Sequence, residues 1–86
     1  MNRIIEFDTV RIVALHGTPE SHLAVADAER PPRVGDLGTV VHLVPTFDAD
    51  DPATRFIVES SEGGPSWVWL AEFGRDELEL VARPGA

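Results

Sequence analysis

The sequence predicts an all-β domain, a small barrel of five short strands with at most one short helix within residues 18–30. The chain has 86 residues, which is the size of a single domain. Its apolar and β-branched residues fall in five short runs, separated by segments rich in glycine, proline and aspartate. Strands at this density in so short a chain must curve into a barrel or a strongly bent sheet. One domain is expected over residues 1–83, with a tail at 84–86.

The first strand is expected between Ile4 and Leu15, where β-branched residues are frequent. Val10 and Ile12 share one face of this strand. The alternation is irregular before Asp8, so the strand either begins at Phe7 or carries a bulge there.

Residues 17–32 are the least strand-like part of the chain. Thr18 followed by Pro19 is typical of an N-cap and the first position of a helix. Pro31 and Pro32 would end such a helix. The segment is therefore either a short helix or a loop.

Gly35 and Gly38 bracket a predicted tight turn, because glycine tolerates positive φ. A strand is expected to follow at Thr39–Val44, and Pro45 ends it because proline cannot donate to a sheet. The glycine pair lacks the Gly-Lys-Ser/Thr ending of a phosphate-binding loop, which favours a structural turn over an anion site.

An acidic loop at residues 47–54 separates this strand from the remaining three. These are expected at Arg55–Ser60, Trp67–Phe73 and Glu77–Val81. In the last of them, Leu78 and Leu80 are predicted to point inward, and Glu77 and Glu79 outward.

Four pieces of the sequence together resemble a bacterial family of small SH3-like barrels of unknown function. They are Phe7–Ile12, Gly35-Asp36-Leu37-Gly38-Thr39-Val40-Val41, Phe56–Glu59 and Asp76–Val81. The glycine-containing piece is similar to KOW segments and other SH3-like modules. The resemblance implies a fold and brings no activity, cofactor or catalytic residue with it.

An Sm-like barrel, in which a helix precedes five bent strands, is the second reading. Proteins of that kind form rings and bind RNA. The Arg-Gly pair of their second motif does not occur in this sequence.

The charge balance argues against nucleic acid as a partner. The chain has 15 acidic residues against 7 basic ones, all arginine, and its net charge is −8. Nucleic-acid binding draws most of its affinity from cationic side chains that neutralise phosphates, and anionic membrane surfaces are disfavoured for the same reason. There is no apolar run of membrane-spanning length and no signal-peptide core, so a cytoplasmic protein is expected.

The sequence offers no recognisable catalytic or metal site. It has no cysteine, which removes thiol catalysis and thiolate zinc sites. His16, His22 and His42 lack the spacing of metal ligands. A calcium loop beginning at Asp48 would place Ala53 where that loop needs glycine. No serine lies in a nucleophile elbow, so neither an enzyme nor a bound cofactor is expected.

The segment Trp67–Phe73 is apolar on both faces, whereas a strand of a small barrel usually has one polar face. Either residues 17–32 cover its second face, or an aromatic patch is exposed for self-association or a partner peptide. The candidate contact residues are Trp67, Trp69 and Phe73, since tryptophan is enriched at interface hot spots.

The leading hypothesis is a non-catalytic protein-interaction module that self-associates, as a homodimer or another homo-oligomer, through this aromatic strand. The first alternative is an acidic inhibitor or immunity-type protein that binds a basic partner, because complementary charge speeds encounter. The second is an Sm-like ring that binds RNA.

Overall fold

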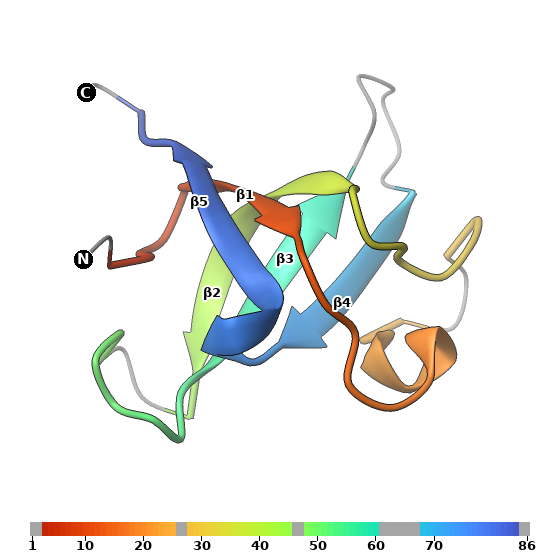
Figure 1. Cartoon of the computed structure of the whole chain (residues 1–86), viewed down its shortest axis with the longest axis horizontal. Coiled ribbons are helices and arrows are strands. Elements are labelled where there is room, and N and C mark those ends of the chain that lie inside the picture. Colours follow the sequence, from red (N-terminus) through yellow and green to blue (C-terminus); the bar gives the residue numbers. More distant parts are fainter. Residues whose placement is uncertain (1–2, 26–27, 46–47, 61–67, 85–86) are drawn as a thin grey trace.

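The computed structural model describes residues 3–25, 28–45, 48–60 and 68–84, and these residues form one antiparallel sheet. The elements in chain order are β1 (Thr9–Ile12), the 3-10 turn η1 (Pro19–His22), β2 (Leu37–Val44), β3 (Arg55–Ser60), β4 (Trp69–Phe73), the 3-10 turn η2 (Arg75–Glu77) and β5 (Leu78–Ala82). The strand order across the sheet is β4-β3-β2-β1-β5 (Figure 1). The predicted all-β architecture with five strands is confirmed.

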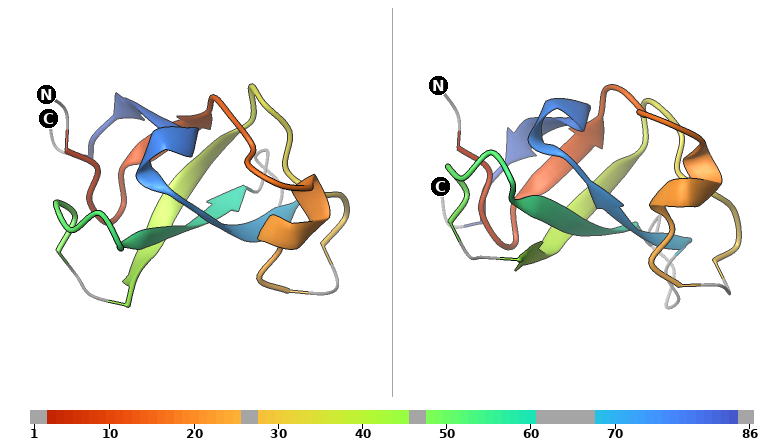
Figure 2. Two further views of the ribbon diagram at one scale, coloured as in Figure 1. Left: turned by 60° about the horizontal axis from the view of Figure 1, so that its bottom comes forward. Right: turned by 90° about the horizontal axis from the view of Figure 1, so that it is seen from below.

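The sheet is strongly curved, and β5 passes across the other strands instead of lying flat beside them (Figures 1 and 2). Backbone pairing does not join β5 to β4 in the described part of the chain, so the sheet remains open. Alternate side chains of the strands point to its concave side and form the core. The core residues are Ile4, Val10, Ile12, Val40, Leu43, Phe56, Val58, Val68, Trp69, Ala71, Phe73 and Leu78.

The first strand is shorter than expected and begins after a turn. The N–H of Asp8 bonds to the carbonyl of Ile5 at 3.2 Å, and Phe7 in this turn has φ +72°. The strand begins at Thr9 and not at Phe7, and the register shift in the β1–β5 pairing lies between Thr9 and Val10, after the position where the bulge was expected.

The segment between β1 and β2 contains one 3-10 turn and then follows the edge of β4. Thr18 caps η1 as predicted, with its side chain accepting from the N–H of Ser21. Beyond η1 the N–H groups of Ala24 and Glu29 bond at 2.8 Å to carbonyls of Leu70 and Val68. This segment therefore occupies hydrogen-bonding groups at the edge of β4 that would otherwise be free.

The two glycines of the predicted turn have different roles. Gly35 has φ +99° and open space around it, so its backbone conformation is what requires glycine. Gly38 lies inside β2, which begins two residues earlier than expected. A Cβ on Gly38 would lie 2.6 Å from Val58 Cγ1 and 2.8 Å from the carbonyl oxygen of Glu59, so close packing against β3 requires glycine there.

The remaining strands agree with the sequence pattern except at the ends. β3 has the predicted bounds, and β4 begins at Trp69. The predicted turn at 61–66 and the start of the next strand at Trp67 lie outside the described residues. The prediction that Glu77 points outward was wrong, because Glu77 belongs to η2, which turns its side chain into the protein, where it is 1% exposed.

Candidate functional site

Two of the three aromatic side chains proposed as interface residues, Trp69 and Phe73, contribute to the core. Trp69 and Phe73 have no exposed surface, and their rings meet edge to face at a centroid distance of 5.6 Å. The indole N–H of Trp69 donates to Asp36 at 2.9 Å. Trp67 lies outside the described residues. The two described aromatic residues cannot contact a partner while the chain is folded as here.

Three carboxylates each join distant parts of the chain and are called here the bridging carboxylates: those of Asp36, Glu77 and Asp8. Asp36 Oδ2 accepts from Arg30 at 2.8 Å and from the N–H of Arg33 at 3.0 Å, and Asp36 Oδ1 accepts from Arg30 at 3.2 Å. Burial raises the pKa of Asp36, but the hydrogen bonds from Arg30, Trp69 and Arg33 outweigh it and lower the pKa overall.

Glu77 is the second bridging carboxylate and the most buried ionic contact. Its Oε2 accepts from His22 Nε2 at 2.7 Å and from the N–H of His16 at 2.8 Å, and its Oε1 accepts from the N–H of Gly74 at 2.8 Å. Burial raises the pKa of Glu77, but these three donors more than offset it and lower the pKa. The other nitrogen of His22 lies 2.9 Å from the carbonyl oxygen of Thr18.

Asp8, the third bridging carboxylate, connects the two ends of the chain. Arg83 donates to both of its oxygens at 2.9 Å, and the N–H of Ile5 donates to Oδ2 at the same distance. Arg83 also donates to the carbonyl of Arg3. Burial raises the pKa of Asp8, but the Arg83 and Ile5 bonds lower it on balance. All three carboxylates therefore stabilise the fold and have their oxygens occupied by donors.

The histidines do not converge. His16 Nε2 lies 2.9 Å from Asp76 on the surface, and His42 Nδ1 lies 3.7 Å from Glu6. Over residues 3–25, 28–45, 48–60 and 68–84, no group of three or more histidine, aspartate and glutamate side chains is placed to hold a metal ion.

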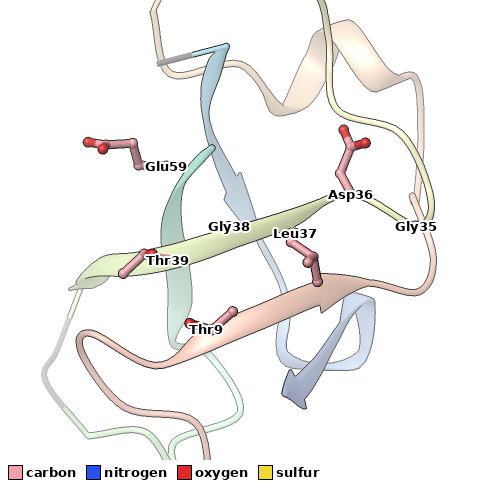
Figure 3. Close-up of a pocket in the computed structure, with 7 residues that line it drawn as sticks. All are labelled: Thr9, Gly35, Asp36, Leu37, Gly38, Thr39 and Glu59. Atoms are coloured by element: carbon pink, nitrogen blue, oxygen red, sulfur yellow. The ribbon is translucent and has the colours of Figure 1, made fainter. Parts of the chain in front are cut away.

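A hollow of about 440 Å³ lies on the outer side of β2. Its walls come from β1, from β2 with the turn before it, and from β3 (Figure 3). The lining residues are Thr9, Gly35, Asp36, Leu37, Gly38, Thr39 and Glu59. Thr9, Thr39 and Glu59 stand opposite one another in the sheet register and form one row across three strands.

The charged groups of the hollow differ in what they can bind. The oxygens of Asp36 are occupied, as described above. Within the described residues no hydrogen bond or ion pair reaches the exposed carboxylate of Glu59. Glu59 is therefore the group that offers a negative charge to an incoming molecule, at the rim of a hollow that is also lined by Leu37, Thr9 and Thr39, and its side chain points away from Leu37 (Figure 3).

Apolar side chains extend this surface onto the outer side of β1 and β5. Leu37 is 48% exposed, Val13 43% and Val81 42%. Arg11, opposite Leu37 in the register, pairs with Glu79 at 2.7 Å. This surface, called here the outer face, consists of Thr9, Arg11, Val13, Leu37, Thr39, Glu59, Glu79 and Val81. The signal that could have revealed it is the position of Leu37, an apolar residue two places before Thr39 on the outward side of the strand.

Comparison of the sequence with models of protein families and with curated proteins, and of the structure with solved structures, finds no significant match. No helix among the described residues is long and apolar enough to cross a membrane.

Proposed function

We propose that the chain is a non-catalytic protein-interaction module that binds a basic partner protein through the outer face. The observation that carries the proposal is the hollow, whose lining includes both the exposed side chain of Leu37 and Glu59, a carboxylate without an ion pair among the described residues. An apolar contact flanked by an available charge suits a partner that presents arginine or lysine next to an apolar side chain. The net charge of −8 favours encounter with such a partner.

We further propose that the fold is an SH3-like barrel. The antiparallel strand order β4-β3-β2-β1-β5, with a 3-10 turn between β4 and β5, supports this reading. The Sm-like alternative would place a helix before the first strand, and residues 3–8 contain none. That observation and the acidic charge both weigh against an RNA-binding ring.

Self-association is the competing proposal, and the same observations make it weaker. Two of its three contact residues, Trp69 and Phe73, are fully buried. A dimer built on the outer face would bring together two chains that each carry a net charge of −8. Like charges repel across an interface unless each is paired, and among the described residues Glu59 takes part in no ion pair.

The test is a selection of random twelve-residue peptides displayed on phage against the wild-type protein. We expect enrichment of peptides that contain arginine or lysine next to an apolar residue. The variant Leu37→Asp should bind the enriched peptides at least about tenfold more weakly, as expected for a central contact. Ala53→Asp is the matched control, because it adds the same charge on an exposed loop; it should change binding by less than about twofold.

Two outcomes would contradict the proposal. One is enrichment of neutral or acidic peptides only, or of none. The other is a wild-type dimer, seen by size-exclusion chromatography with light scattering, that Leu37→Asp dissociates; this result would assign the outer face to a second copy of the chain.

A further inference from the structure

Phe7 combines two features that stability alone does not explain. Its side chain is 60% exposed, the largest exposed aromatic group in the described part of the chain. Its backbone has φ +72°, a left-handed conformation that bulky residues rarely adopt. A glycine or asparagine in this turn would avoid the backbone strain. Because the ring of Phe7 is exposed, it contributes little to the stability of the core.

The surroundings of Phe7 form a second, smaller hollow. It has a volume of about 330 Å³ and is lined by Ile5, Glu6, Phe7 and Leu43. Three of these side chains are apolar, and Glu6 adds a negative charge at the edge. Both hollows therefore combine apolar surface with a carboxylate, although that of Glu6 lies 3.7 Å from His42 Nδ1.

The two hollows are close in the fold. The N–H of Phe7 bonds to the carbonyl of Val40, and the residue before Val40, Thr39, lines the larger hollow. Thr9, two residues after Phe7, lines it as well. Two residues of chain span at most about 7 Å, so the backbone of Phe7 lies within about that distance of Thr9 at the wall of the larger hollow.

We propose that Phe7 is a contact residue for the basic partner, held outward by the strained turn so that its ring packs against an apolar side chain of that partner. The proposal rests on the proposed function and adds a second contact to it. Backbone strain at a residue with an exposed aromatic side chain is the pattern expected where a fold gives up stability for binding.

The first arm of the test measures stability. Phe7→Ala removes the ring but keeps a Cβ, so the backbone strain at positive φ remains. Phe7→Gly removes the ring and also the Cβ, and with it the strain. Phe7→Gly should therefore melt about 5 °C higher than Phe7→Ala. Val81, an exposed strand residue, is the matched control; there the order should reverse, with Val81→Gly melting below Val81→Ala.

The second arm measures binding with the basic peptides selected on the wild-type protein. Both Phe7→Gly and Phe7→Ala should weaken binding about tenfold, although Phe7→Gly is the more stable of the two. The inference is overturned if Phe7→Gly binds like the wild type while Leu37→Asp does not, a result that leaves the proposed function standing. It is also overturned if Phe7→Gly melts below Phe7→Ala. If no basic peptide is selected at all, the proposed function fails and this inference fails with it.

Discussion

Replacing Glu77 by glutamine tests whether the buried His22–Glu77 contact holds the β4–β5 junction to η1. Glutamine has the same shape but only one accepting oxygen. Glu77 accepts three hydrogen bonds through two oxygens, from His22, His16 and Gly74. The amide NH₂ of glutamine must therefore face at least one N–H donor, and the charge opposite His22 is lost.

The expected loss is large for a chain of this size. Leaving a buried hydrogen-bond donor without an acceptor costs about 1–3 kcal/mol. An 86-residue domain has a total stability of roughly 4–13 kcal/mol. With an m-value of about 1 kcal/mol per molar urea, the unfolding midpoint should fall by about 1–3 M.

Urea unfolding followed by tryptophan fluorescence measures this midpoint, since Trp69 is fully buried in the folded state. Asp76→Asn is the control: Asp76 lies in the same 3-10 turn but is exposed, and its loss should cost less than about 1 kcal/mol. A midpoint for Glu77→Gln within about 0.5 M of the wild type would refute the assignment of a stabilising role to this contact.

Three further predictions concern stability. Gly38→Ala should lower the free energy of unfolding, measured with urea, by about 2–3 kcal/mol, because the added methyl group meets β3. Gly35 lies in open space at positive φ, so Gly35→Ala should lower it by only about 1 kcal/mol. Equal losses of stability in the two variants would contradict the packing argument. Arg83→Ala removes the donors to both oxygens of the buried Asp8 and should lower the melting temperature by more than Arg11→Ala, which breaks an exposed pair; similar melting temperatures for the two variants would argue against the connection between Asp8 and Arg83. The bridging carboxylates have lower pKa values when folded than when unfolded, so their stabilisation is complete above about pH 5 and is lost as the pH falls through the folded values; a melting temperature that does not decrease between about pH 5 and pH 2.5 would contradict this.

Much of the strand pattern follows from the sequence because it is local. Alternation with a period of two placed Phe56 and Val58 on the inner face of β3, and the structure gives that strand the predicted bounds. The cap at Thr18 was predictable for the same reason, since its partner Ser21 is three residues away.

The candidate site was much less predictable. Trp69 and Phe73 lie on a strand that is apolar on both faces, so alternation alone did not show which face is buried. The hollow at Leu37 and Glu59 depends on how β1, β2 and β3 lie beside one another, and it is built from residues far apart in the sequence.

The sequence by itself determined the number and pattern of the strands and the net charge of −8, because these depend on composition and on neighbours a few positions apart. Only the tertiary structure decided which acidic residues stabilise the fold and which are available to a partner. Glu59 and Glu77 both lie in short runs that the sequence pattern predicts to be strands. Glu77 turns inward because its donors come from 55 and 61 residues away, where η1 and the segment before it pack against the β4–β5 junction. Glu59 meets no such donor among the described residues, and its charge stays at the surface.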